Sequence, residues 1–533
     1  MFYFTIKSPS NLVDSSAVKE ISPTRRNEIF RTENIVENVP NQPNKEFFAT
    51  TIFKQREKPF NFSNKPTNTI SKQSNETPDN NMQVSPEQIL AKMQEGVTKE
   101  CNYLKDNSET KTPYKIFIYD LPAYYNQEVL AFFFGKQRQC FDLNFCGTGK
   151  EIMKVGAENL NKYHDYIQEI RNTEQFALEV IFHVKLKHSL FRTMNPEEAD
   201  IFYIPAYTGL NCLTFRENGD HFVNSLFGYL NQNLSKYYSS GKPHFMALSK
   251  IEREQASDMC TTLRHPDSEK ITFIGIEREI SPFIQHRAKG RVNIVAPYPS
   301  YMHFVPNPAS KAMYEFQNGL RNLSTTQFRL NAPNLEERDV LLFLAASTRR
   351  SNSFRAELLD EFQFKTSKGF EETIKKFRTE SRTMPSQIML ITHECMSGHQ
   401  KETIPWMRHS KYCLQPPGDS PTRKSIYDSI LSGCIPILFR LKQGKTILPF
   451  EKYLNYTTFS YFLEESVISR HNKTVIEIVK ELPDSKTQFL HSNLIRIAKW
   501  FQYSLPNSFS NNNDDNAMSL ILDELGSIHN LLD

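Results

Sequence analysis

The chain has 533 residues, enough for about two to four domains, and 39% of them are hydrophobic, so sizeable cores can form. The formal charge is only +4 and the positive residues are scattered. A nucleic-acid-binding protein would show a concentrated basic stripe, so no nucleic-acid partner is expected. No apolar run approaches the roughly 18 residues that span a bilayer, and Met1–Leu12 lacks the pattern of a signal peptide.

The eight cysteines are compatible with either a reducing or an oxidising compartment. There is no C-x-x-C pair, and the histidines and cysteines between residues 393 and 413 fit no common zinc spacing. We therefore expect no metal site. Cys434 lies in a dense apolar run and is expected to be a free core thiol.

Taken in chain order, the sequence alternates between strand and helix patterns. Residues 1–112 are rich in Asn, Ser, Thr, Pro, Lys and Glu and are expected to be disordered, apart from a helix over Pro86–Lys105. A strand is predicted over Tyr114–Pro122, and apolar spacing predicts a helix over Glu174–Lys187. Further strands are predicted over Ile201–Pro205, Ile271–Ile276, Val292–Ala296 and Val340–Ala346. This alternation indicates an α/β fold with parallel sheets.

The pattern predicts two Rossmann-like domains, at about residues 113–310 and 335–472. A helical segment over residues 473–505 is expected to pack back on the body. Residues 506–533 contain an Asn/Asp run near their start and are expected to form a tail.

Residues 412–439, YCLQPPGDSPTRKSIYDSILSGCIPILF, are the most informative part of the chain. Tyr412–Gln415 is a short apolar run that the following prolines and glycine end, and Cys434–Phe439 is a run typical of a buried parallel strand. Between them we predict a helix with Ser420 as N-cap, Pro421 at its first position and Gly433 at its C-terminus.

The start of that helix would open at the carboxyl end of a strand, where open α/β sheets bind ligands. Hydroxyls of Ser420, Thr422 and Ser425 and the cations Arg423 and Lys424 gather there, which makes a candidate phosphate site. A capped surface helix without a ligand shows the same local pattern, so that alternative stays open. Asp419 argues against an anion unless its carboxylate caps the helix or holds a hydroxyl.

The segment Leu414–Pro436 resembles the signature of the exostosin-type glycosyltransferases (family 47), and most closely the branch of the plant xyloglucan galactosyltransferases. That branch reads LQPPGDS-x-TRRS, then an aspartate, then GCIP, and here Lys424 stands for one of its arginines. Tyr114–Pro122, the segment 191–210 and Asn455–Ser460 also resemble the family.

The resemblance implies a GT-B architecture, in which two Rossmann-like domains face each other across a cleft. The first would be the acceptor side and the second would bind the nucleotide sugar. It also implies location in the Golgi lumen by a type II membrane anchor near the N-terminus, which is not visible in this sequence, with residues 1–112 as the flexible stem. A Cys395–Cys413 disulfide is implied as well, and a homodimer or heterodimer stays open.

On the donor side, the family solution predicts cations rather than a metal, because the chain contains no Asp-x-Asp pair. Arg355 follows a predicted buried strand and small-residue turn, and Ser353-Phe-Arg355 matches the family. Arg355, Arg423 and Lys424 are therefore the candidate phosphate ligands. Asp428 is a candidate for a ribose hydroxyl, or else an exposed helix carboxylate paired with a lysine.

On the acceptor side, an inverting transfer needs a general base. The candidates are His244, Glu279 and His303, which lie in segments that resemble the family's GRDHF, ESSPW and PYP motifs. Pro243 replaces the aspartate of the first motif, which weakens this side of the prediction. A lone histidine is more often structural.

We therefore expect an inverting glycosyltransferase that moves a sugar, best a β-galactosyl group, from a UDP-sugar to a polysaccharide or glycan. No tightly bound cofactor and no metal requirement are expected. The alternatives are a heparan-type β-glucuronyltransferase, or a catalytically silent nucleotide-binding scaffold of the same fold.

Overall fold

The computed structural model describes residues 112–135, 142–155, 166–214, 219–306, 330, 332–346, 355, 358, 388–391, 400–440, 445–464, 473–505 and 516–532. All of them belong to the second of the two units into which the chain divides, Met1–Asn81 and Met82–Asp533. The predicted stem and its helix Pro86–Lys105 lie outside the described residues. No helix within the described ranges is both long and apolar enough to cross a membrane.

The first sheet has six parallel strands in the order β4-β1-β5-β6-β7-β9. Their bounds are β1 Ile116–Ile118, β4 Arg192–Thr193, β5 Ile201–Tyr203, β6 His244–Leu248, β7 Ile271–Gly275 and β9 Val292–Val295. The central strands β5, β6 and β7 are buried at every position, because helices cover a parallel sheet on both faces. This is why their sequences are continuous apolar runs.

Seven α-helices and four short 3-10 turns are described in this part of the chain. The α-helices are α3 Gln127–Gly135, α4 Leu178–Lys187, α5 Thr208–Thr214, α6 Gly219–Asn233, α7 Ser235–Tyr238, α8 Glu252–Gln255 and α9 Pro282–Arg287. The 3-10 turns are η1 Ala123–Tyr125, η2 Pro196–Glu198, η3 Thr262–Arg264 and η4 Pro266–Lys270. A small antiparallel sheet joins β10 Met302–Pro306, β3 Tyr166–Arg171 and β2 Glu151–Val155.

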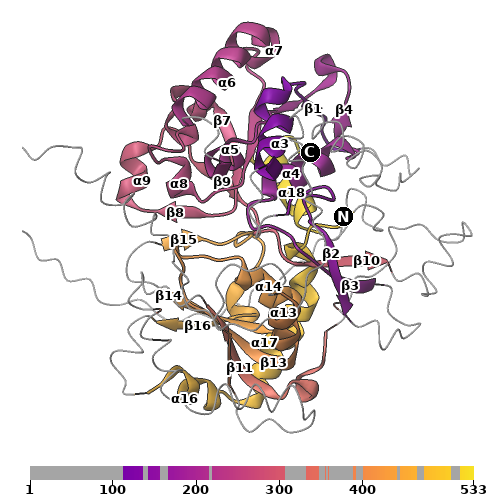
Figure 1. Ribbon diagram of the computed structural model, residues 1–533, viewed down its shortest axis with the longest axis vertical. Coiled ribbons are helices and arrows are strands. Elements are labelled where there is room, and N and C mark those ends of the chain that lie inside the picture. Colours follow the sequence, from indigo (N-terminus) through magenta and orange to yellow (C-terminus); the bar gives the residue numbers. More distant parts are fainter. Residues whose placement is uncertain are drawn as a thin grey trace, which may run out of the picture. The chain divides into compact units, whose positions relative to one another are not determined.

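The second sheet has five parallel strands in the order β12-β11-β13-β14-β16. Figure 1 labels β11, β13, β14 and β16 of this sheet. They are β11 Val340–Ala345, β12 Ile388–Ile391, β13 Ser410–Gln415, β14 Ile435–Arg440 and β16 Tyr461–Glu464. The helices of this part are η6 Leu335–Glu337, α13 Gln400–His409, α14 Ser425–Leu431, η7 Tyr456–Thr458, α16 Val475–Lys480, α17 Asp484–Ile497 and η8 Ala498–Phe501.

Helices cover both faces of this second sheet. Leu414 and Ile437 on one face pack with α16 and α17, through Val475 and Leu490. Cys413 points to the other face, in the cluster that holds the buried residues of α13 and α14. The predicted α/β fold with two separate parallel sheets, as the GT-B architecture requires, is confirmed. Both sheets lie inside the predicted domain ranges 113–310 and 335–472, whose exact bounds stay predictions.

Two further contacts join the part of the chain that contains the first sheet to the part that follows it. The strand β15 Lys445–Ile447 pairs antiparallel with β8 Arg278–Ile280, which precedes it by more than 160 residues. The segment 473–505 contains α16, α17 and η8, and its Tyr503 donates a hydrogen bond to the carbonyl of Pro297.

The prediction of a tail over residues 506–533 is wrong for its second half. Residues Ala517–Ile528 form helix α18, whose apolar side chains at Met518, Ile521, Leu522 and Leu525 are buried. The hydroxyl of Tyr114, at the start of the first sheet, donates to the carbonyl of Leu522 at 2.7 Å. The amphipathic helix α18, which follows the Asn/Asp run, therefore packs into the core that contains the first sheet.

The disulfide predictions are also wrong. Cys413 on β13 pairs with Cys434, which directly precedes β14, at a Cα–Cα distance of 5.7 Å. The parallel register places Cys413 opposite Pro436, so Cys434 lies within reach of it. Cys434 is therefore no free thiol, and Cys413 is not available to Cys395, which lies outside the described residues. A second disulfide joins Cys212 and Cys260.

Candidate active site

The segment between β13 and α14, residues 416–424, is called the signature loop below. Helix α14 begins at Ser425, four residues later than Pro421, so the predicted N-cap at Ser420 is wrong. Ser420 does not cap a helix, because its hydroxyl donates to the carboxylate of Glu277. The predicted helix end is confirmed: Gly433 has a φ of +71°, the left-handed conformation that glycine tolerates best.

Arg423 lies at the topological switch point of the second sheet. The chain continues from β11 to β12 on one side and later to β13 on the other, and ligands of open α/β sheets bind where such a reversal occurs. The guanidinium of Arg423 donates to the carbonyl of Ala345, the last residue of β11, at 2.7 Å. Burial and, to a smaller extent, nearby Arg355 lower the pKa of Arg423 to about 10.

Arg355, which follows β11 in the chain, contacts the same loop. Its Nε and Nη2 donate to the carbonyl of Pro417 at 3.2 and 2.9 Å. A Cβ added at Gly418 would lie 3.0 Å from this guanidinium, so glycine permits the close approach. Burial lowers the pKa of Arg355, while Asp419 opposes that shift. The structure thus brings two predicted phosphate ligands together at one loop.

Lys424 and Asp428 form a buried ion pair. Lys424 Nζ lies 3.2 Å from both carboxylate oxygens of Asp428, and burial lowers the pKa of the lysine to about 8. Asp428 Oδ1 also accepts hydrogen bonds from Ser300 Oγ at 2.6 Å and from the Tyr301 N–H at 3.0 Å. The pairing with a lysine was one of the two predicted readings, but the carboxylate is buried rather than exposed. The ribose role stays a prediction.

The remaining signature residues are held by other parts of the chain. Asp419 is exposed, and its carbonyl accepts from Arg253 Nη1 at 3.2 Å. Ser425 Oγ donates to the side chain of Gln415, at the end of β13. Thr422 gives both its N–H and its hydroxyl to Glu277. The polar groups predicted to bind phosphate are therefore partly engaged in contacts within the protein.

Glu277 is the residue that our sequence analysis missed. It lies two residues after the end of β7, is fully buried, and its Oε2 accepts from Ser420 Oγ at 2.8 Å and from the N–H of Thr422 at 3.0 Å. Burial raises its pKa to about 7, although the hydrogen bonds from Thr422 and Ser420 oppose this. A carboxylate at the end of a predicted buried strand was the available signal, but the motif resemblance indicated Glu279 instead.

Glu279 lies two residues further, on β8, and forms an ion pair with Arg253. Arg253 donates to both carboxylate oxygens of Glu279 at 2.6 Å, and the backbone N–H of Glu279 donates to Glu252. This arginine also contacts the carbonyl of Asp419, so Glu279 supports the signature loop through Arg253. Its role as a base stays a prediction, which the bidentate pairing does not favour.

The two histidine candidates lie in the core. His244 begins β6, at the amino end of the first sheet, where its ring stacks on Phe202 and its Nε2 lies 2.8 Å from the hydroxyl of Tyr119. His303 lies on β10, between Thr173 Oγ1 and the carbonyl of Tyr503. Burial lowers their pKa values to about 4 and about 3, and for His303 nearby Lys424 contributes to the lowering. The hydrogen-bond partners named here are core groups and not site candidates.

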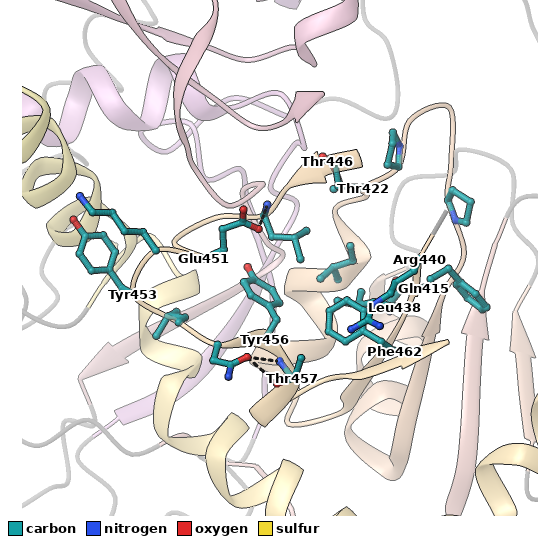
Figure 2. Close-up of a pocket in the computed structure, with 18 residues that line it drawn as sticks. Gln415, Thr422, Leu438, Arg440, Thr446, Glu451, Tyr453, Tyr456, Thr457 and Phe462 are labelled. Carbon is teal, nitrogen blue, oxygen red and sulfur yellow. Dashed lines mark hydrogen bonds between the residues drawn. The ribbon is translucent and has the colours of Figure 1, made fainter. Parts of the chain in front are cut away.

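A cavity of about 780 Å³ opens beside the signature loop (Figure 2). Its wall combines the loop with the carboxyl ends of β13, β14 and β16 and with residues 446–457. The lining residues used below are Thr422, Arg440, Lys452 and Tyr453. Apolar side chains such as Leu438 and Phe462 form part of the wall, as in many small-molecule sites.

The match to known proteins covers the region that contains this site. The exostosin GT47 domain matches residues 110–481. The chain belongs to the exostosin GT47 family. The resemblance drawn from Leu414–Pro436 is thereby confirmed, and with it the assignment to the glycosyltransferases.

Curated relatives of this GT47 protein come from Arabidopsis thaliana. A probable xyloglucan galactosyltransferase is 27% identical over 418 residues, which cover 74% of this chain and 77% of that protein. A xyloglucan galactosyltransferase is 25% identical, over 74% of this chain and 59% of the other. A xyloglucan-specific galacturonosyltransferase is 26% identical, over 71% of this chain and 52% of the other. The chain thus spans little more than half the length of the last two.

Solved structures give more distant matches. HepE of Anabaena, in complex with UDP and glucose, matches 62% of this chain and 78% of its own, with 12% identity and a TM-score of 0.27. Sucrose-phosphate synthase from Thermosynechococcus elongatus matches 66% of this chain and 78% of its own, with 10% identity and a TM-score of 0.30.

Proposed function

We propose that this GT47 protein transfers a hexosyl group, best galactosyl, from a UDP-sugar to a hydroxyl of a polysaccharide, with inversion at the anomeric carbon. The observation that carries the proposal is the placement of Arg423 and Arg355 at the switch point of the second sheet, beside a cavity of about 780 Å³. Two of the Arabidopsis relatives carry galactosyltransferase names, which supports the donor.

The two arginines suit the leaving group of this reaction. When the sugar–phosphate bond breaks, negative charge accumulates on the diphosphate, and prepositioned cations stabilise it. A guanidinium has five N–H donors, and Arg423 places two of them on the carbonyls of Ala345 and Pro416. The others can bind phosphate oxygens. We propose that these cations supply the charge stabilisation without a metal ion.

A uronosyl donor is the second candidate. Arg440 and Lys452 line the cavity, and either cation could bind the carboxylate of UDP-galacturonate or of UDP-glucuronate. Arg440 already pairs with Glu464 at 3.1 Å, an exposed contact of little energy that a bound carboxylate could replace. The galacturonosyltransferase among the relatives supports this candidate, which also covers the heparan-type alternative.

The scaffold alternative loses part of its support. Pro243, which replaces the family's aspartate, directly precedes β6 and accepts a hydrogen bond from the N–H of Phe202. It therefore lies at the amino end of the first sheet, whereas Glu277 and the signature loop lie at carboxyl ends. The departure at Pro243 does not alter the site described above.

We further propose that the protein works in an oxidising compartment such as the Golgi lumen. The disulfides Cys212–Cys260 and Cys413–Cys434 support this, because disulfides persist outside the reducing cytosol. The polysaccharide acceptor would be met in the same compartment.

The test is calorimetry of the full chain with UDP, UDP-galactose, UDP-galacturonate and UDP-glucuronate, with and without EDTA. We expect UDP to bind in the presence of EDTA. Arg423→Ala should lower the affinity for UDP about 10- to 100-fold, because one charged hydrogen-bonding group is worth about 1.5–3 kcal/mol. Arg440→Ala is the matched control, expected to keep UDP affinity and to lose only a preference for uronates. A folded wild type that binds no nucleotide would remove the enzyme proposal and leave the scaffold.

A further inference from the structure

Glu277 joins the two parallel sheets at their carboxyl ends. It follows β7 of the first sheet, and its Oε2 accepts three hydrogen bonds from Ser420 and Thr422, which follow β13 of the second sheet. Carboxyl ends are where parallel sheets bind ligands, so Glu277 lies where a donor on one sheet and an acceptor on the other would meet. Three donors on one oxygen also hold the carboxylate in a single orientation.

The second oxygen of this carboxylate distinguishes Glu277 from the other buried glutamates nearby. Glu277 Oε1 is buried and has no hydrogen-bond partner among the described residues. Glu252 and Glu279, by contrast, both have an arginine partner. A buried carboxylate oxygen without a partner costs about 1–3 kcal/mol or more, and native structures rarely keep one without a functional reason.

Burial is the main reason why the pKa of Glu277 is raised to about 7, and Glu279 on β8 raises it as well, while the hydrogen bonds from Thr422 and Ser420 oppose this. Arg253 of α8 is the nearby cation, and the phenols of Tyr298 and Tyr427 stay neutral because burial raises their pKa values. A group that titrates there can take up a proton at neutral pH and release it again after turnover.

Thr422 connects this carboxylate to the cavity. Thr422 is one of the residues that line the cavity (Figure 2). Its hydroxyl donates to Glu277 Oε2. A hydroxyl can donate one hydrogen bond and accept two, so Thr422 can accept a proton from the cavity while it gives its own to Glu277.

We propose that Glu277 is the final proton acceptor of the transfer reaction and that the Thr422 hydroxyl carries the proton to it. The acceptor oxygen forms a bond to the anomeric carbon, and the bond from that carbon to the UDP oxygen breaks, with its electron pair leaving on UDP. The acceptor proton passes to Thr422 Oγ1, whose own proton passes to Glu277. This inference rests on the proposed glycosyl transfer.

The test compares Glu277→Gln, Thr422→Val and Thr422→Ser with wild type in the full chain. The assay is UDP release from UDP-galactose, first with a xyloglucan oligosaccharide as probe and then with water alone. We expect Glu277→Gln and Thr422→Val to lower kcat about 100- to 10,000-fold with UDP affinity kept within about threefold, and Thr422→Ser to keep most of the activity. The wild-type kcat should rise with pH through about 7 as Glu277 ionises, and Glu277→Gln should lose this dependence.

Glu279→Gln is the matched control, because it removes a buried carboxylate two residues away. It is expected to lower stability through the unpaired Arg253 and to keep a rise of kcat with pH, but with a midpoint below pH 7, because Glu279 no longer raises the pKa of Glu277. A folded Glu277→Gln with wild-type kcat and an unchanged pH profile would overturn the proposal. If that variant does not fold, an active Thr422→Val with the wild-type profile overturns it instead. Wild type that binds no UDP would remove the proposed function first, and this inference with it.

Discussion

Replacing Asp428 with asparagine separates a structural role of this carboxylate from a role in binding ribose. Asp428 pairs with Lys424 and accepts from Ser300 and Tyr301, all inside the protein. Asparagine keeps an acceptor oxygen for the last two but removes the charge that stabilises the ammonium group. We expect the variant to lose stability and to keep its affinity for UDP.

The magnitude follows from the pKa of Lys424. Burial lowers it from 10.5 to about 8, with Asp428 as the largest opposing influence. Without the carboxylate it falls further, and at pH 7 the lysine becomes mostly neutral. Because each pKa unit corresponds to about 1.4 kcal/mol, moving the pKa from about 8 to below 7 costs about 1–1.5 kcal/mol at pH 7. Weaker hydrogen bonds to a neutral amide add about 1 kcal/mol.

The deficit has a defined pH dependence. The stabilisation that Asp428 gives to the charged lysine is present while Lys424 is protonated, and it is lost as the pH rises through about 8. The lysine-dependent part of the deficit should therefore vanish by about pH 9 and grow below pH 7. In a Lys424→Met background, Asp428→Asn should show no such dependence, because no titrating partner remains.

Urea unfolding followed by circular dichroism at pH 7 and pH 9 measures the free energy of unfolding, and calorimetry measures the affinity for UDP. The reasoning is refuted if Asp428→Asn keeps the wild-type free energy of unfolding within about 0.5 kcal/mol at pH 7 and yet binds UDP about tenfold more weakly. That result would assign the carboxylate to the nucleotide.

Two further predictions concern stability. Replacing both Cys413 and Cys434 with alanine should cost about 3 kcal/mol of unfolding free energy, because the bond closes a loop of 21 residues, and denaturant titration checks this against wild type under oxidising conditions, where the bond is intact. The pKa of His303 falls from 6.5 to about 3 through burial, so the histidine stays neutral in the fold while the unfolded chain takes up a proton below pH 6.5. The stability that the neutral His303 ring contributes is full above pH 6.5 and is lost as the pH falls. His303→Asn should therefore reduce the loss of stability between pH 7 and pH 5 by about 2 kcal/mol. An unchanged loss would contradict the assigned pKa.

The strands were predictable because they are buried on both faces. The runs Ile271–Ile276, Val292–Ala296 and Val340–Ala346 match β7, β9 and β11 to within one residue at each end. Helix α18 was missed although Met518, Ile521, Leu522 and Leu525 have helical spacing, because the Asn/Asp run before them was taken as the start of a tail. The start of α14 was misplaced because Ser420 satisfies a distant carboxylate instead of a local N–H.

The site was predictable where a local pattern or the family resemblance marks its residues. Arg423 was identified from the pattern at the start of the predicted helix and Arg355 from the family resemblance, and the structure brings them to the same loop. The lysine partner of Asp428 was one of the predicted readings, but Ser300 could not be found in this way, because it lies 128 residues away and no local pattern signals the contact. Such partners follow from the topology of two sheets whose carboxyl ends supply one site.

The choice between Glu277 and Glu279 shows what the sequence lacked. Both glutamates follow the same buried strand, two residues apart, and both are buried. Their chemistry differs because Arg253, from helix α8, reaches Glu279 and neutralises it, while Glu277 receives only neutral donors from the signature loop. The oxygens of Glu279 are both engaged by a guanidinium, whereas Glu277, bonded only to neutral donors, has its pKa raised to about 7 by burial. The position of one arginine side chain therefore decides which of two adjacent carboxylates can serve as a base.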